Sequence, residues 1–152
     1  MSKLSHIDAT GKPAMVDVTA KESTPRQARV EGLLLIKPLH REALANLPKG
    51  DAITVAEIAG VLAGKRCSDL IPLCHPVPLS YIDVKIRLEE AGLRITSQAK
   101  TTAQTGVEME GYTAVAIAGV TLIDMLKGVD PDLTLTDIRL LEKTGGKSDW
   151  KR

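Results

Sequence analysis

Residues 105–127, TGVEMEGYTAVAIAGVTLIDMLK, contain the strongest helical pattern in the chain, and the other elements are expected to pack around them. Thr105 and Glu108 have the spacing of a capping box, which marks a helix N-terminus. Gly128, followed by Pro131, is typical of a helix end. The apolar residues between these ends recur at steps of three and four, as on one face of a helix: Val107, Met109, Ala114, Ala118, Leu122 and Met125.

The charged residues of this predicted helix are acids. Glu108, Glu110 and Asp124 are the only charges before Lys127. A carboxylate is costly to bury without a partner, so each should meet a cation, a ligand or water. Glu108 can instead close the capping box, and Asp124 shares a face with Lys127 three residues later. Glu110 has no cation three or four residues further on, which favours a functional role for it.

Small residues give the same helix a surface that another backbone can approach closely: Gly111, Ala114, Ala116, Ala118 and Gly119. Its uninterrupted apolar run is far shorter than the roughly 20 residues that span a membrane, and acids flank it. We therefore predict a buried helix that packs against a sheet and against another helix.

The overall composition excludes several classes of function. With one Trp, two Tyr and no Phe, the chain lacks aromatic platforms for single-stranded nucleic acid. The formal net charge of +1 gives no electrostatic attraction for DNA or RNA. The N-terminus has no hydrophobic signal region, and Cys67 and Cys74 match neither a disulfide framework nor a CxxC motif. A reduced, cytoplasmic location is expected.

The 152 residues suit one domain with ragged ends. We expect a flexible N-terminal arm over 1–14, a single α+β catalytic domain over 15–143, and a mobile tail rich in glycine and lysine over 144–152. Asp51 or Thr54 can cap a second helix, and Thr54 with Glu57 has the spacing of another capping box. Alternating or apolar patterns predict strands over 15–19, 27–37, 80–89, 93–102 and 133–142, and helices over 40–47 and from the 51–54 caps to about residue 65. This order favours an antiparallel sheet with helices packed on one face.

Two loops carry residues that suit a binding site. Lys49 precedes a predicted helix N-terminus, where an anion would satisfy both the lysine and the free N–H groups, although the side chain could simply point into water. Prolines make residues 71–79, IPLCHPVPL, unsuitable as helix or central strand. This apolar loop, with Cys74 and His75 at its centre, is either the wall of a pocket or a buried surface loop.

Taken together, these groups indicate a nucleotide-like phosphate ester handled by acid–base chemistry. The lysines at helix ends and in glycine-flanked loops, Lys49, Lys127 and Lys147, suit phosphate. Histidine and carboxylates suit proton transfer and purine-edge hydrogen bonds. The chain has neither a Walker motif nor a GxGxxG fingerprint.

A zinc site is a second interpretation of the cysteines. Cys67, Cys74 and His75 could supply three ligands, with His6 or His40 as the fourth. Adjacent cysteine and histidine followed by proline does not give the usual ligand spacings, so no metal site is predicted.

The length of the helix over 105–127 separates its acids. Glu110 and Asp124 are fourteen residues apart, which is about 21 Å along a helix. Either they serve different sites, or one site takes Glu110 from one subunit and Asp124 from another. We predict a homo-oligomer with sites at subunit interfaces.

Six segments, in this order, resemble the MoaC family over nearly the whole chain: Met15–Thr19, Lys49–Asp51, Asp69–Pro76 (DLIPLCHP), Thr105–Glu110 (TGVEME), Asp124-Met125 with Lys127, and Gly145–Ser148. The resemblance implies the cyclic pyranopterin monophosphate synthase of molybdenum cofactor biosynthesis. This lyase takes a 3′,8-cyclised dihydro-GTP made by a radical enzyme and rearranges it to cyclic pyranopterin monophosphate, releasing pyrophosphate. It also implies a ferredoxin-like subunit and a hexamer built as a trimer of dimers, with sites at dimer interfaces.

The resemblance assigns roles residue by residue. It implies that Asp124 is the catalytic acid or base and that Lys49 and Lys127 are needed for the chemistry. The implied substrate-binding residues are Leu73, Cys74, His75, Met109, Glu110 and Lys147. No cofactor is required by this interpretation, and magnesium with the triphosphate is possible but not predicted.

The chain departs from the family pattern at a few positions. Gln104 stands where a basic residue is usual, which leaves one phosphate contact open, and Gly111-Tyr112 and Asp149 also differ. Two rival classes are a non-catalytic nucleotide sensor, which would bind without turnover, and a metal-dependent nucleotide hydrolase. The hydrolase would need carboxylates clustered around one Mg²⁺, and the acids here are dispersed.

Overall fold

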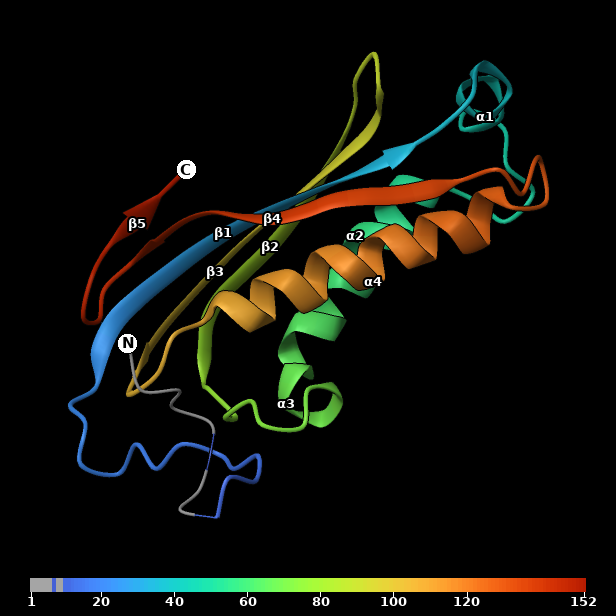
Figure 1. The fold of residues 1–152 in the computed structure, drawn as a ribbon. Coiled ribbons are helices and arrows are strands. Elements are labelled where there is room, and N and C mark those ends of the chain that lie inside the picture. Colours follow the sequence, from blue (N-terminus) through green and yellow to red (C-terminus); the bar gives the residue numbers. More distant parts are fainter. Residues whose placement is uncertain (1–6, 8–9) are drawn as a thin grey trace.

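The computed structural model describes residue 7 and residues 10–152, so His6 and most of the predicted arm's first nine residues lie outside the described part. The elements follow in the order β1 (Thr24–Leu35), α1 (Pro38–Ala43), α2 (Ala52–Lys65), α3 (Cys67–Leu70), β2 (Leu79–Leu88), β3 (Gly92–Ala103), α4 (Glu108–Leu126), β4 (Thr134–Thr144) and β5 (Trp150–Lys151). They form one antiparallel sheet in the order β2-β3-β1-β4-β5, and α2 and α4 cover one face of it (Figure 1). The predicted α+β class is confirmed.

The core lies between the sheet and these two helices. On β1, the buried residues Ala28 and Val30 alternate with exposed or half-buried neighbours, and Gly32, Leu33 and Leu34 are then buried in succession. The inner face of α4 meets them with Leu122 and other buried apolar residues. By length and composition alone α4 could cross a membrane, but more than half of it is buried. It has the position of a core helix in a globular domain.

Glycines bring α2 and α4 close together. A Cβ atom at Gly60 would lie 2.9 Å from the carbonyl oxygen of Ala114, and one at Gly64 would lie 3.1 Å from that of Glu110. Real side chains almost never come as close as the first distance. The predicted close approach of a second helix to the 105–127 helix is therefore confirmed, with glycines of α2 as well as the small residues of α4 providing it.

Local details of the helix ends differ from the expectations. α4 begins at Glu108, and its N-cap residue Val107 makes no side-chain cap bond. Glu108 accepts a hydrogen bond from Lys143 Nζ at 3.0 Å instead, so the capping box with Thr105 is wrong. Asp51 does cap α2, accepting from two backbone N–H groups at 3.0 and 3.2 Å. The second capping box is wrong, because Glu57 accepts from the N–H of Ile86 on β2.

The chain ends also differ from the expectations. Residues 15–19 form no strand. The chain turns after them, and the backbone N–H of Lys21 donates to the carbonyl oxygen of Val18. Within the predicted tail, β5 pairs with the end of β4 through Lys143 and Trp150. The mobility of residues 144–152 stays a prediction.

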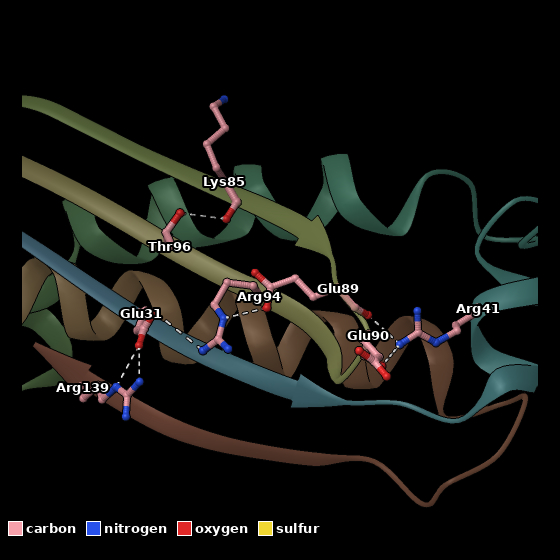
Figure 2. A network of polar contacts seen from close by, with 8 residues as sticks. All are labelled: Glu31, Arg41, Lys85, Glu89, Glu90, Arg94, Thr96 and Arg139. Atoms are coloured by element: carbon pink, nitrogen blue, oxygen red, sulfur yellow. Dashed lines mark hydrogen bonds and ion pairs between the residues drawn. The ribbon is translucent and has the colours of Figure 1, made fainter. Parts of the chain in front are cut away.

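A charged network lies on the other face of the sheet (Figure 2). Glu31 on β1 accepts from Arg139 on β4 at 2.8 Å and lies 3.7 Å from Arg94 on β3. Arg94 also contacts Glu89 at the end of the β2–β3 hairpin. In Figure 2 the helices lie behind these strands, so the network joins three strands on the face that α2 and α4 leave open.

Candidate active site

The residues expected to act on a substrate lie at the two ends of α4. Met109 and Glu110 stand in its first turn and Asp124 in its last. The fourteen-residue separation corresponds to about 21 Å of helix. Within one chain, the structure therefore does not bring the predicted catalytic residues together with the predicted ring-binding residues.

Asp124 forms a three-residue cluster with two lysines at the C-terminal end of α4. Lys127 Nζ lies 2.6 Å from Asp124 Oδ1, and Lys49 Nζ lies 3.5 Å from Oδ2. Lys49 also donates to the backbone oxygen of Asp124 at 3.1 Å. The hydrogen bond from Lys127 and the positive charges of both lysines lower the pKa of Asp124. All three side chains are more than half exposed, so a substrate can reach them.

Lys49 has a partner that neither of the two interpretations offered for it named. The N–H groups at the start of α2 are taken by the carboxylate of Asp51. Lys49 turns instead toward the end of α4. Lys49 therefore lies with Asp124, and an anion bound at the α2 N-terminus stays a prediction.

At the other end of α4, Glu110 is buried with almost no partner. It is 3% exposed, and its Oε2 atom makes no hydrogen bond within the described part of the chain. Its Oε1 atom lies 3.9 Å from Cys74 Sγ, which lies 3.8 Å from Cys67 Sγ. Burial raises the pKa of Glu110, and it raises the pKa of Cys74 to about 12, with the charge of Glu110 adding to the shift. Burial also raises the pKa of Cys67.

The histidines of the zinc interpretation are engaged elsewhere. Both ring nitrogens of His40 are bonded, Nδ1 to the N–H of Lys37 and Nε2 to the carbonyl of Asp130. His75 Nε2 donates to the carbonyl of Val16 at 2.6 Å. His6 lies outside the described residues. The two cysteines do lie close together, but the third potential metal ligand beside them is the carboxylate of Glu110 rather than a histidine.

The 71–79 loop lines a cavity of about 450 Å³. Leu73, Cys74 and His75 face it from the loop, and Met109 faces it from α4. Of the two interpretations of this loop, the pocket wall is therefore correct. Cys74 links the cavity to the buried carboxylate of Glu110, because its thiol contacts that group.

A larger, basic cavity of about 610 Å³ adjoins the first one, since His75 and Glu108 line both. The predicted residue Lys147 lines it. The cationic residues around it are Lys21, Arg26, Lys143 and Lys147.

Sequence reasoning assigned no role to Lys21 or Arg26. Arg26 donates to the carbonyl groups of Ala103 and Gln104, at 3.0 and 3.3 Å. A fixed positive charge thus stands beside Gln104, where a basic residue was expected. Only the pairing of β1 with β3 reveals this, since no local pattern marks Arg26.

The described residues thus form an α+β domain with a basic cavity beside a buried carboxylate, and cavities of this size are typical of small-molecule sites. A sequence model of the MoaC family matches residues 15–146, and the chain belongs to this family. It is 47% identical to the cyclic pyranopterin monophosphate synthase of Streptomyces griseus, over 99% of this chain and 87% of that protein. The proteins of the same name from Roseiflexus castenholzii and Deinococcus radiodurans are 47% and 49% identical, covering 97% and 91% of this chain and 96% and 83% of theirs.

Proposed function

We propose that this protein is a cyclic pyranopterin monophosphate synthase of molybdenum cofactor biosynthesis. It converts (8S)-3′,8-cyclo-7,8-dihydroguanosine 5′-triphosphate to cyclic pyranopterin monophosphate and releases pyrophosphate. The observation that carries this proposal is identity of 45–49% to enzymes of that name, each covering at least 91% of this chain. The arrangement of the two cavities supports it independently.

The basic cavity is suited to the triphosphate. Lys147, Lys143 and Arg26 bring positive charge to its walls. Fixed cations of this kind hold phosphate groups and stabilise a departing pyrophosphate. The adjoining cavity, with His75 and Glu110 behind Cys74, would then receive the guanine-derived ring, since these groups can bond to its polar edge.

Proton transfer is carried out by the cluster of Lys49, Asp124 and Lys127 at the C-terminal end of α4. Because two lysines lower the pKa of Asp124, this carboxyl group is ionised at neutral pH and can accept a proton. Lys127, 2.6 Å away, is then the donor within the pair. Lys49 holds the backbone and side chain of Asp124 in position and supplies a second positive charge for the phosphates.

The separation of the two clusters favours active sites shared between subunits. One nucleotide cannot easily touch both Glu110 and Asp124 of one chain across about 21 Å. On α2, Val55, Ile58 and Leu62 form an exposed apolar stripe, with exposures of 42%, 57% and 50%. Large exposed apolar patches mark interaction surfaces. We assign this surface to contacts with other copies of the chain, in a homohexamer built as a trimer of dimers with sites at dimer interfaces.

The remaining expectations belong to the same proposal. The proposed ferredoxin-like fold is supported by the βαββαβ order and by the adjacency of β2-β3-β1-β4 in the sheet. The enzyme works in the cytoplasm, and its protein groups suffice without a cofactor. Magnesium can accompany the triphosphate.

The test is turnover of the 3′,8-cyclised GTP by the purified protein without added metal, following pyrophosphate and the cyclic phosphate product. Asp124→Asn and Lys49→Ala should each reduce kcat by about 10²–10⁴, the range for general acid–base groups. Asp132→Asn, an exposed acid paired with Lys37, is the matched control and should retain activity. Tight binding without turnover in the native protein would favour the nucleotide sensor and sink the proposal.

Mixing experiments test the shared site. Inactive Glu110→Gln and Asp124→Asn proteins, unfolded and refolded together, should recover part of the native activity, because some interfaces then combine two intact halves. Refolding each variant alone is the control. If mixed oligomers form and no activity returns, each site lies within one chain.

A further inference from the structure

Cys67, Cys74 and Glu110 form a cluster of potential metal ligands, and the proposed reaction does not explain why all three lie together. One ligand atom from each of the three residues lies within 4.8 Å of the others. Cys67 comes from α3, Cys74 from the 71–79 loop and Glu110 from α4. Cys67 is 2% exposed and lines neither of the cavities assigned to the substrate.

Two of the distances in this cluster are close to the edges of a metal coordination tetrahedron, and all three ligand atoms lie within 4.8 Å of one another. With Zn–S bonds of about 2.3 Å, two thiolates of a tetrahedral zinc site lie about 3.8 Å apart. The observed Cys67 Sγ to Cys74 Sγ distance is 3.8 Å. With a Zn–O bond of about 2.0 Å, the sulfur-to-oxygen edge is about 3.5 Å, and Cys74 Sγ lies 3.9 Å from Glu110 Oε1. A disulfide would instead require the sulfurs to approach to about 2.05 Å.

The cluster also lacks a cation. Glu110 Oε2 is buried without a hydrogen-bond partner, and no ion pair to Glu110 occurs among residues 7 and 10–152. Buried polar atoms without partners are rare in proteins and point to an absent ion or ligand. A divalent cation would bond the carboxylate and both sulfurs, while the adjoining cavity gives it access past Cys74.

We propose that Cys67, Cys74 and Glu110 bind a thiophilic divalent cation, Zn²⁺, with water as the fourth ligand. Each thiol releases its proton to solvent as its Zn–S bond forms, so the bound ion faces two thiolates and one carboxylate. Hard Mg²⁺ does not compete, because it prefers oxygen ligands and octahedral geometry.

A consequence for activity rests on the proposed function. Glu110 and Cys74 belong to the proposed ring-binding pocket, whereas Cys67 does not. Zn²⁺ at this cluster would take the carboxylate away from the substrate, so metal and substrate bind in competition. The cluster would then make the enzyme sensitive to free zinc.

The direct test uses reduced, chelator-stripped protein titrated with Co²⁺, which reports its ligands by absorption. We expect one equivalent of Co²⁺ to give thiolate charge-transfer bands and the visible bands of tetrahedral coordination, and Zn²⁺ to bleach both. Cys67→Ser should weaken Co²⁺ binding at least about tenfold by removing a thiolate ligand, and Glu110→Gln should do so as well. Glu108→Gln, the neighbouring acid on the same turn, should bind Co²⁺ like the native protein.

Activity provides the second readout. Zn²⁺ should inhibit the native enzyme, while Cys67→Ser, which keeps a hydroxyl beside Thr113, should retain metal-free turnover and resist inhibition. Circular dichroism establishes that this variant is folded. Absence of the thiolate bands in the native protein, or an unchanged Co²⁺ affinity in Cys67→Ser, would overturn the metal site. The Co²⁺ spectra need no substrate, so they stand even if the proposed enzymatic activity fails.

Discussion

Replacing Glu110 with glutamine should make the metal-free protein more stable at neutral pH. The native carboxylate is 3% exposed, its Oε2 atom has no hydrogen-bond partner among the described residues, and its Oε1 atom lies 3.9 Å from the thiol of Cys74. A buried polar group without a partner costs about 1–3 kcal/mol, and more when charged. The neutral amide removes the additional cost of burying a charge, so we expect a gain of about 1–3 kcal/mol in the free energy of unfolding. The melting temperature should rise about 2–4 °C per kcal/mol.

The gain in stability from Glu110→Gln should increase as the pH rises. Burial raises the pKa of Glu110 in the folded protein. Its folded form therefore holds the proton where the unfolded form, with a pKa of about 4.3, has lost it. The native protein loses stability as pH rises from the unfolded pKa through the folded pKa, and the loss is complete above both. The difference in the free energy of unfolding between Glu110→Gln and the native protein should thus be smallest at acid pH, below the unfolded pKa of about 4.3, and should grow as the pH rises toward neutral.

The assay is denaturant unfolding at several pH values, at fixed protein concentration, with a reductant and a chelator present. Glu108→Gln is the matched control, because that acid is half-buried and paired with Lys143. It should change stability by no more than about 1 kcal/mol, and in the unfavourable direction. A Glu110→Gln protein that is less stable than the native one at pH 7, or whose gain is the same at every pH, would refute the reasoning. The same variant should lose turnover, since stability is often sacrificed at functional positions.

Three further predictions concern packing, capping and the basic cavity. Gly64→Ala should destabilise the fold by about 1–3 kcal/mol, because the new methyl group would displace the Ile82 side chain of β2 and crowd the backbone of α4 at Glu110. Gly128→Ala, where a Cβ meets nothing within 4 Å, should change the free energy of unfolding by less than about 0.5 kcal/mol. Asp51→Ala should cost about 0.5–2 kcal/mol through loss of the α2 cap, measured by denaturant unfolding. Lys147→Ala should raise KM for the triphosphate substrate and flatten its salt dependence, whereas Lys65→Ala, on the exposed end of α2, should leave both unchanged.

The periodicity of the sequence located the main elements, because each pattern reflects one buried face. Alternation in 80–89 and 93–102 corresponds to the hairpin of β2 and β3, and the three- and four-residue steps in 105–127 correspond to α4. The strand predicted over 15–19 was wrong, since a brief alternation of five residues does not ensure a neighbouring strand with which to pair.

Helix ends were harder to predict, because polar side chains near them form hydrogen bonds with residues that are distant in the sequence. Glu108 pairs with Lys143 of β4, and Glu57 accepts from Ile86 of β2. Each replaces a capping bond that the local spacing had favoured. Asp51, whose partners lie two and three residues away, was predicted correctly.

By itself, the sequence determined the α+β class, the family and the identities of the proposed site residues, since these depend on local periods and on motifs that can be read directly. Only the tertiary structure decided which of those residues meet. It placed Lys49 at Asp124, Arg26 beside Gln104, and Cys67 and Cys74 against Glu110. These contacts join residues from 36 to 78 positions apart, and the packing of α2 and α4 and the pairing of the strands bring them together. No local sequence pattern encodes these contacts, because the distance between the two residues of each contact depends on how all the helices and strands pack around the core.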